Sequence, residues 1–135
     1  MKLARAAKQP AQKGAARSFT GVAWQQPIVI GETAEPRHVT RVTFEPGART
    51  VWHLHPVGQV LVATLSAGRF QVEGGPVMAP HQGGSFTLSP GEKHWHEAAR
   101  DHLFIHLSIQ AADRNGAQAT WLEPVAEEDY ARALA

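Results

Sequence analysis

The 135-residue sequence contains no cysteine, which excludes disulfide bonds, thiolate ligands for a metal ion and a thiol nucleophile. It also contains no run of about 18 apolar residues, the length that a membrane-spanning helix needs. The net charge of +1 gives no overall field that would attract nucleic acid or an anionic membrane. We therefore expect a protein that binds neither nucleic acid nor membranes, and the missing cysteines are compatible with the reducing cytoplasm.

The charges are unevenly distributed along the chain. Before the first acidic residue, Glu32, the sequence carries only basic charges, at Lys2, Arg5, Lys8, Lys13 and Arg17. Residues 1–17 have neither the apolar stretch of a signal peptide nor an aromatic side chain that could stack on a base. We predict a basic, partly flexible arm over residues 1–17 and one domain over residues 18–135, a length that encloses a single hydrophobic core.

From residue 19 onward, short runs rich in Val, Ile, Thr, Phe and Trp alternate with turns that contain Gly or Pro. This pattern predicts an all-β domain, built as a sandwich, jelly roll or barrel. The expected strands are 19–24, 38–44, 51–55, 59–66, 68–73, 77–79, 85–88, 94–98, 102–110 and 120–122. The one expected helix covers residues 123–134, where Pro124 and early acidic residues favour a helix start.

Histidines form two clusters that lie about forty residues apart in the sequence. His53, His55 and Gln59 have the same parity, so their side chains can point to one face of a strand. His94 and His96 form a second pair of equal parity, directly after a turn at residues 89–92. A single His-x-His pair is weak evidence, because such histidines more often have structural roles. Two pairs framed by glycine turns predict a shared site.

The spacing around both clusters resembles the two motifs of the cupin family. The first motif is Gly, five residues, His-x-His, three or four residues, Glu and a later Gly, and it reads here Gly47, His53, His55, Gln59 and Gly68. The second is Gly, five residues, Pro-x-Gly, two residues, His and a later Asn, and it reads here Gly83, Ser89, Gly91, His94 and Ala98. The resemblance implies a cupin double-stranded β-helix, a jelly-roll barrel, with a metal ion held by His53, His55, Gln59 and His94.

Gln59 departs from the family pattern, because it stands where most cupins have a glutamate. An amide in place of a carboxylate removes one negative charge from the ligand set and leaves a divalent ion with its full formal charge. Such a site favours Lewis-acid chemistry over the stabilisation of a higher oxidation state.

Most of the chain, from Phe19 to Glu123, further resembles the bacterial cupin hydroxynitrile lyases. The residues that carry this resemblance are the stretches 43–50, 52–53, 58–59, 89–96 and 106–110. It implies a manganese ion, with iron, nickel or zinc as alternatives, and the cleavage of cyanohydrins to an aldehyde and hydrogen cyanide. It also implies a small-molecule substrate and a homodimer or homotetramer.

Within residues 102–110, parity separates an aliphatic face from a polar one. On its own this pattern is more often an outer strand with its polar side in water, but beside a metal the polar side can line a cavity. The resemblance then implies His106 beside the substrate as proton acceptor, with His96 as its competitor and Gln110 as an orienting group. The predicted substrate-binding residues are Thr40, Val42, Phe44 and Phe104. Glu97 stands where these lyases carry a glycine, and its parity turns it away from the pocket.

Two other functions are compatible with the same ligands. One is a cupin dioxygenase that uses iron, nickel or copper at open coordination positions. The other is a cupin without enzymatic activity that binds a small molecule, since the fold alone does not determine the reaction.

Overall fold

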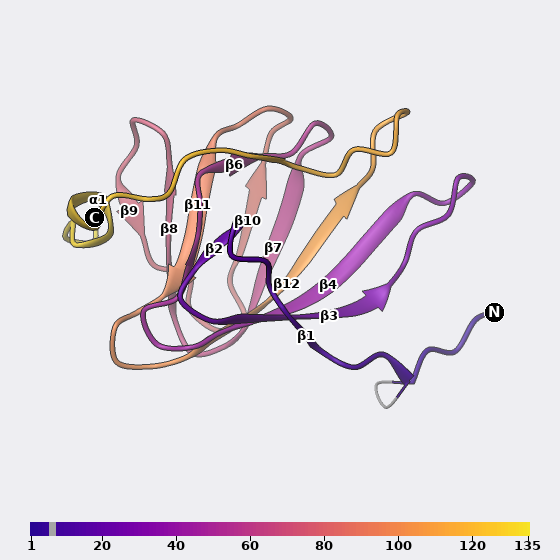
Figure 1. The fold of residues 1–135 in the computed structure, drawn as a ribbon, viewed down its shortest axis with the longest axis horizontal. Helices are drawn as coiled ribbons and strands as arrows, with labels where there is room; N and C mark the ends of the chain where they lie inside the picture. The colour runs from indigo at the N-terminus through magenta and orange to yellow at the C-terminus, as the bar shows by residue number, and fades with distance from the viewer. Residues whose placement is uncertain (6–7) are drawn as a thin grey trace.

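Two curled antiparallel sheets form the molecule, and the computed structural model describes residues 1–5 and 8–135 (Figure 1). The strands are β1 (Gln12–Lys13), β2 (Phe19–Thr20), β3 (Ala23–Val29), β4 (Arg37–Phe44), β5 (Arg49–Thr50), β6 (His53–Leu54), β7 (Gln59–Leu65), β8 (Gly68–Val72), β9 (Val77–Met78), β10 (Ser85–Leu88), β11 (His94–Ala98), β12 (Phe104–Ala111) and β13 (Thr120–Trp121). One short helix, α1 (Glu127–Tyr130), is found among the described residues. The all-β class predicted from the sequence is confirmed.

The first sheet has the strand order β1-β3-β4-β12-β7-β10, with β12 at its centre. Register across β12 places Gln110 between His38 and Gln59, and His106 between Val42 and Ala63. Because side chains of one cross-strand row point to the same face, the polar residues of β12 and β7 meet inside the molecule. The predicted polar side of this strand therefore faces inward.

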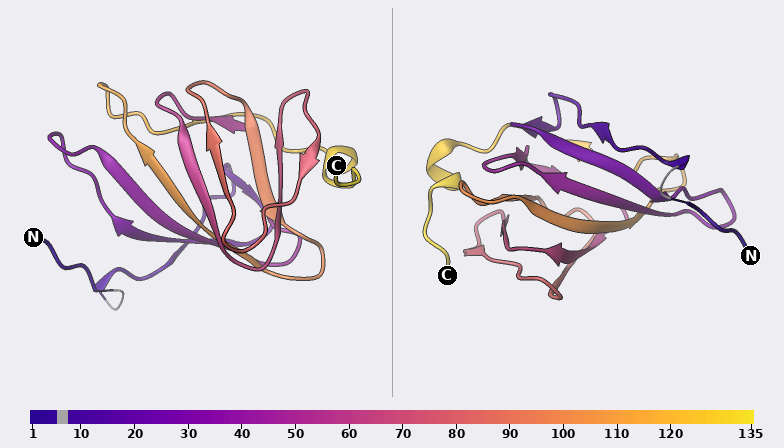
Figure 2. Two further views of the ribbon diagram at one scale, coloured as in Figure 1. Left: turned by 180° about the vertical axis from the view of Figure 1, so that it is seen from behind. Right: turned by 90° about the horizontal axis from the view of Figure 1, so that it is seen from below.

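The second sheet has the strand order β13-β6-β11-β5-β2, and β8 pairs with β11 and β9. His94 of β11 and His53 of β6 are register partners in this sheet. Views from behind and from below show the two sheets curling around a shared interior (Figure 2). The two histidine clusters, distant in sequence, are thus brought together by one strand pairing.

The hydrophobic core closes one end of this interior. Buried aromatic and small side chains of both sheets pack there, and they include Phe19, Phe44, Phe104, Ala63 and Ala98. The rings of Phe44 and Phe104 stack with centroids 6.4 Å apart. This packing leaves the polar rows of β7 and β12 at the opposite end of the interior.

The aliphatic side of β12 lies on the outer surface of the first sheet. Ile105, Leu107 and Ile109 are half-buried there, and cross-strand partners in β7, Val60 and Val62, extend the apolar face. This face is apolar on the β7 side of β12, whereas Thr43 and Arg41 of β4 border it on the other side. An apolar surface of this kind is one that an oligomer covers. The homodimer or homotetramer stays a prediction.

The C-terminal helix is much shorter than residues 123–134, which is the range that the sequence predicts. Upstream, the backbone N–H groups of Trp52 and Leu122 pair with the carbonyls of Glu123 and Trp52 in an extended arrangement. Downstream, Ala135 donates to the carbonyl of Val77. These tertiary hydrogen bonds outweigh the helical pattern on both sides, so only Glu127–Tyr130 is helical.

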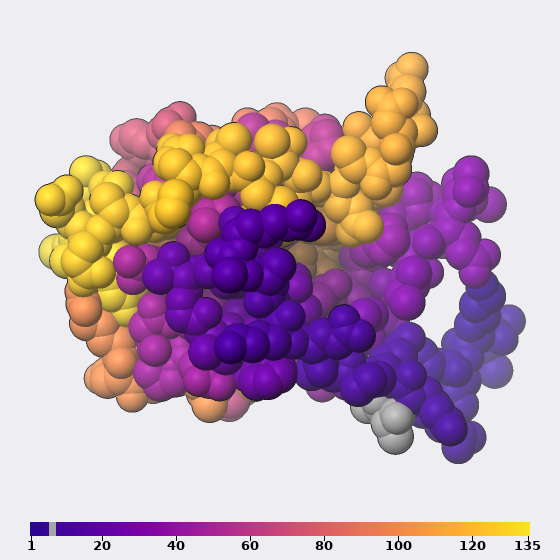
Figure 3. Space-filling view, in the orientation of Figure 1, coloured from indigo at the N-terminus to yellow at the C-terminus, as the bar shows by residue number. Residues whose placement is uncertain are grey.

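The predicted arm contributes a strand to the first sheet, since Gln12 of β1 pairs with Gln25 of β3. In the space-filling view, this N-terminal segment crosses the front of the molecule in indigo (Figure 3). The domain boundary at residue 18 stays a prediction. Within residues 1–5 and 8–135, no helix is long and apolar enough to cross a bilayer.

Candidate metal centre

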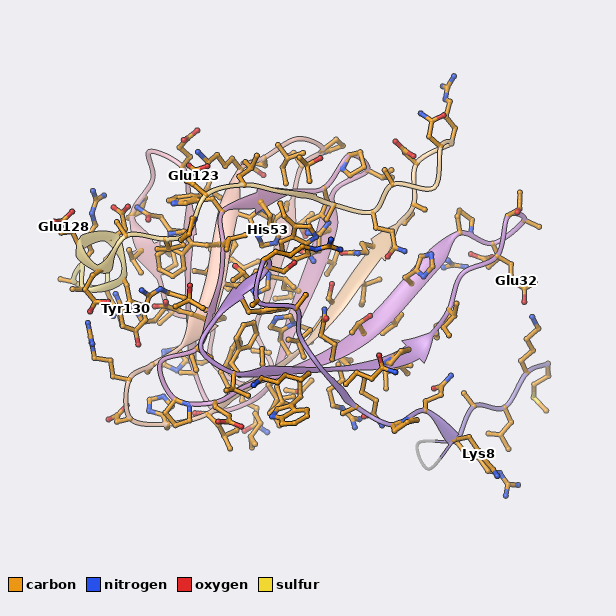
Figure 4. The ribbon with its side chains drawn as sticks, in the orientation of Figure 1. Lys8, Glu32, His53, Glu123, Glu128 and Tyr130 are labelled. Atoms are coloured by element: carbon orange, nitrogen blue, oxygen red, sulfur yellow. The ribbon has the colours of Figure 1, made fainter. Side chains whose placement is uncertain are left out.

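Three imidazoles converge between the sheets, two from paired strands and one from the turn that follows. The ring centroids of His53 and His94 lie 4.2 Å apart, and His55 lies 5.1 Å from His53 and 5.5 Å from His94. His53 is labelled in Figure 4, inside the molecule. The turn after His55 needs Gly58, whose φ is 84° and where an added Cβ would lie 2.6 Å from the carbonyl oxygen of Leu88.

Each of these three imidazoles has its Nδ1 atom bonded to a backbone carbonyl. Nδ1 of His53 lies 2.9 Å from the carbonyl oxygen of Val51. Nδ1 of His55 lies 2.7 Å from that of Gln118, and Nδ1 of His94 lies 2.8 Å from that of Glu92. A carbonyl oxygen only accepts, so Nδ1 carries the hydrogen and the lone pair is on Nε2. This outer hydrogen bond is typical of histidines that ligate a metal.

The free lone pairs of this group are buried. Nε2 of His55 and Nε2 of His94 have no hydrogen-bond partner within the described part of the chain. Leaving a buried polar atom unpaired costs free energy, about 1–3 kcal/mol each. A metal ion at this point would satisfy them.

Gln59 presents an oxygen to the same region. Its Nε2 donates to Oγ of Ser108 at 2.7 Å and to Oε1 of Gln110 at 3.0 Å, so the amide orientation is defined. Its Oε1 is buried and unpartnered among the residues that the structure describes. An amide oxygen beside neutral imidazole nitrogens is a donor set that fits a divalent metal ion.

A fourth imidazole, His96, lies within reach of the same point as His53 and His94. The ligand atoms of His53, His94 and His96 all lie within 4.8 Å of one another, an arrangement that could hold a metal ion. The sequence predicts His96 as a proton acceptor and His55 with Gln59 as ligands, so His96 is an additional candidate ligand. The predicted set of four ligands stays a prediction.

His96 is also paired with His106. Nδ1 of His96 lies 3.2 Å from Nε2 of His106, and these two atoms share one hydrogen. The other nitrogens, Nε2 of His96 and Nδ1 of His106, have no partner in residues 1–5 and 8–135. The backbone N–H of His96 donates to Oγ1 of Thr50, which fixes the strand position of this pair.

A cavity of about 60 Å³ connects the imidazoles with the polar end of the first sheet. Predicted site residues that line it are Thr40, Val42, His53, His55, Gln59, His96, His106 and Gln110. Larger surface hollows, of about 590 and 490 Å³, lie along the N-terminal segment and between the loops near residues 31–38 and 112–118. We assign the site by its convergent ligand atoms, because the larger hollows lack a buried cluster of this kind in the part of the chain described.

Two predicted substrate-binding residues, Phe44 and Phe104, lie deeper than this cavity. Phe44 is fully buried and packs against His106, with ring centroids 5.5 Å apart. Phe104 lines a small apolar cavity of about 10 Å³ on the other side of the His96–His106 pair. Their predicted contact with substrate stays a prediction, and the structure places them in the core that supports the two imidazoles.

Burial governs the charge state of the cluster. It lowers the pKa of His94 and that of His106 to about 4. Burial also lowers the pKa of His53 and of His96 well below the ordinary value, and the neighbouring imidazoles lower both further. All four side chains are neutral at pH 7, the form that binds a metal or accepts a proton.

The outer face of β11 carries a second buried polar group. Glu97 is fully buried, and its Oε1 lies 2.8 Å from Nε of Arg69. Trp95 donates from Nε1 to Oε1 of Gln71 at 3.0 Å. Parity alone predicted that Glu97 points away from the pocket, and the structure confirms this.

Several cavity-lining residues lie outside the predicted set. They are Phe19, Gln25, Thr50, Ser108 and Trp121. Ser108 shares parity with His106 and Gln110, so the sequence held a signal for it. The ring centroid of Trp121 lies 4.7 Å from that of His53. Trp121 follows a loop without periodicity, so no pattern in the sequence indicated that it lines the cavity.

The sequence and the fold were compared with those of known proteins. No protein-family model matches the chain. The (R)-mandelonitrile lyase of Granulicella tundricola is 43% identical over 134 residues, which cover 98% of this chain and 100% of that protein. A cupin-like protein of Thermotoga maritima superposes with a TM-score of 0.81 at 39% identity, over 87% of this chain and 89% of the other. The polyketide cyclase of Streptomyces resistomycificus shares the fold, with a TM-score of 0.73 at 14% identity over 96% and 90% of the two chains.

Proposed function

This chain belongs to the cupin family that includes the (R)-mandelonitrile lyase of Granulicella tundricola, and on that premise we propose that it catalyses the metal-dependent cleavage and synthesis of cyanohydrins. The proposed reaction is of the kind that converts mandelonitrile to benzaldehyde and hydrogen cyanide. The observation that carries the proposal is the set of buried, unpartnered ligand atoms, found within the described residues on His55, Gln59 and His94.

The proposed ion is manganese, held by Nε2 atoms of His53, His55 and His94 and by Oε1 of Gln59. Three neutral nitrogens and one neutral oxygen suit a divalent ion that does not change its oxidation state. Such an ion, when bound, supplies Lewis-acid stabilisation of negative charge on the substrate oxygen. His96 is the alternative ligand, because it forms a group with His53 and His94 whose ligand atoms lie within 4.8 Å of one another, and its Nε2 is unpartnered among the described residues.

The proton step is assigned to the His96–His106 pair, with His106 as the proposed base. In cleavage, the cyanohydrin O–H bond breaks and its proton passes to a neutral imidazole nitrogen. The electron pair of the C–CN bond leaves with cyanide as the C=O bond forms. The protonated imidazole then returns its proton to cyanide, and hydrogen cyanide departs. Because His106 and His96 share a hydrogen, charge gained by one ring is spread to the other.

The polar end of the cavity provides the orienting groups. Oγ of Ser108 and the amide of Gln110 are hydrogen-bonded beside Gln59, and Thr40 and Val42 line the neighbouring wall. We assign substrate orientation to Gln110 and contact with the substrate carbon skeleton to Val42. Phe44 and Phe104 hold His106 from behind.

The test is metal analysis followed by an assay with racemic mandelonitrile. Manganese-loaded protein should release cyanide and benzaldehyde without oxygen, and His53→Ala protein should not exceed the uncatalysed rate. Equal release by parent and His53→Ala protein, or turnover that requires oxygen, would overturn the proposal. A His106→Ala variant that keeps full activity would assign the proton step to His96.

A further inference from the structure

The loop between β12 and β13 returns the chain to the polar end of the cavity. Asp113 organises this loop, since its Oδ1 accepts from the backbone N–H groups of Asn115 and Ala117 at 2.8 and 2.9 Å. A backbone hydrogen bond from Asp113 to Ala117 closes the turn. Gln118 is the next residue and is half-buried. The turn therefore fixes the position of Gln118 at the polar end of the cavity.

Gln118 is hydrogen-bonded to one proposed metal ligand directly and to a second through Gln110. Its backbone carbonyl accepts from Nδ1 of His55 at 2.7 Å. Its side-chain Oε1 accepts from Nε2 of Gln110 at 3.1 Å. Gln110 in turn uses its Oε1 to accept from Nε2 of Gln59 at 3.0 Å. A single residue outside the ligand set is thus connected to His55 directly and to Gln59 through one intermediary.

The hydrogen bonds of this chain all run in one direction. Gln59 donates from Nε2 to Oε1 of Gln110, and Gln110 donates from Nε2 to Oε1 of Gln118, so Gln110 both accepts and donates along the same direction. Ser108 follows the same order, because it accepts from Gln59 and donates to Oε1 of Gln110 at 3.3 Å. An acceptor at Gln118 therefore determines that Gln59 turns its nitrogen toward Gln110 and its oxygen toward the imidazoles.

We propose that Gln118 is a positioning residue for the metal ion, and that its side-chain oxygen sets which atom Gln59 presents as a ligand. The inference rests on the metal site of the proposed function. Without an acceptor at residue 118, the Gln110 amide can turn over and offer its N–H₂ group to Gln59. Gln59 then turns its own oxygen away from the metal, and an amide N–H₂ group has no lone pair suited to coordination.

The test compares manganese(II) affinity in full-length variants, measured by competition with a chelator. Gln118→Met removes the acceptor at nearly the same volume, and we expect manganese to bind about tenfold to 100-fold more weakly, as for other outer-shell partners of metal ligands. Gln118→Glu keeps an acceptor and cannot donate, so its affinity should stay within about threefold of the parent or become tighter. Both variants retain the carbonyl bond to His55.

Gln26→Met is the matched control. Gln26 is also a half-buried glutamine with a donor and an acceptor bond, to the carbonyl of Gln9 and from Arg41, on a strand outside the cluster. Its manganese affinity should equal that of the parent. The electron paramagnetic resonance spectrum of bound manganese should change in Gln118→Met and not in Gln118→Glu.

Equal affinity in the parent and Gln118→Met overturns the inference. Equal weakening in Gln118→Met and Gln118→Glu also overturns it, because packing rather than the acceptor would then matter. No manganese binding by the parent overturns both this inference and the proposed function. Manganese binding with no cyanide release overturns the proposed reaction alone.

Discussion

The two faces of β11 differ in how they treat buried polar side chains. On the outer face, Trp95 donates a hydrogen bond to Gln71, and Glu97 forms an ion pair with Arg69 at 2.8 Å, although its carboxyl oxygens accept no hydrogen bond from the described residues. On the inner face, His94 and His96 are as deeply buried, yet their Nε2 atoms are unpartnered among the described residues. The outer side chains of this strand thus face partners from β8, by a hydrogen bond at Trp95 and an ion pair at Glu97. The Nε2 atoms of the inner histidines face none among the described residues.

This difference distinguishes a structural role from a functional one. Buried polar groups are normally hydrogen-bonded, because a buried group that lost its bonds to water and gained none in the protein lowers the free energy of unfolding. The paired outer groups hold β11 to β8, where Arg69 and Gln71 lie. The unpaired inner nitrogens gain their partner only from something that enters the site, and this is the property expected of metal ligands.

Burial shifts pKa values in opposite directions on the two faces of β11. On the inner face it lowers the pKa of His94 to about 4, because the charged form of an imidazole loses hydration. On the outer face it raises the pKa of Glu97 to about 8, against the opposing effect of Arg69, Arg49 and Arg100. Both shifts favour the neutral form, so the comparison between the faces can be tested by mutation and by pH.

The largest effect is expected from the inner face. If the proposed function is right, His94→Ala should reduce cyanide release from mandelonitrile by about a thousandfold or more, because it removes a proposed ligand of the ion that would stabilise developing charge. The free energy of unfolding of the metal-free protein should fall by only about 1 kcal/mol for the lost polar contacts, because His94→Ala removes the hydrogen bond from Nδ1 to the carbonyl of Glu92, while Nε2 has no partner to lose among residues 1–5 and 8–135. Cyanide assays and urea unfolding measure the two quantities, and unchanged activity would break the comparison.

The next effect is expected from the outer face. Arg69→Met removes the nearest polar partner of the buried Glu97 side chain and the hydrogen bond from Arg69 to the carbonyl of Tyr130, so it should lower the free energy of unfolding by about 1–3 kcal/mol. Manganese affinity of the remaining folded protein should equal that of the parent. Arg37→Met, which removes an exposed ion pair with Glu35, is the control and should cost less than about 1 kcal/mol. Loss of metal binding in Arg69→Met would show that the two faces are not independent.

Acid should destabilise the metal-free protein through the inner face. The folded-state pKa of His94 and of His106, about 4, lies below the unfolded value of 6.5, so the unfolded chain binds protons first as the pH falls. This contribution to stability is complete above pH 6.5 and is lost as the pH falls toward 4, by about 2 kcal/mol or more. Urea unfolding from pH 7 to pH 4 measures it. His106→Asn should flatten this dependence, and an unchanged dependence in that variant would contradict the assignment to the inner face.

The smallest effect is expected from a single neutral hydrogen bond of the outer face. Trp95→Phe removes the donor to Oε1 of Gln71 and should lower the free energy of unfolding by about 1 kcal/mol beyond the lost ring volume. Gln71→Leu also removes the bond from Nε2 of Gln71 to the carbonyl of Gly75. The double variant Trp95→Phe/Gln71→Leu should therefore lose less free energy of unfolding than the sum of the two single variants. Thermal or urea unfolding provides the measurement, and additive losses would contradict the pairing.

The sequence predicted the inner face well because parity is a local property of a strand. His53, His55, Gln59 and His94 reach one region as their spacing indicates, and Glu97 points outward as expected. The role of Gln118 could not be predicted, because its loop has no periodicity and its contacts depend on where β12 and β13 lie in the fold. The helix was predicted too long for a similar reason, since distant hydrogen bonds at Trp52 and Val77 compete with it.

The pairing of His53 with His94 has a consequence for the order of folding. The two residues are register partners, but the chain between them contains β7, β8, β9 and β10. Closing so long a loop is slow, and the site exists only after β6 and β11 have met. We therefore expect that a metal ion would gain its full set of proposed ligands only late in folding. Binding of the ion should then slow unfolding and leave the rate of folding nearly unchanged.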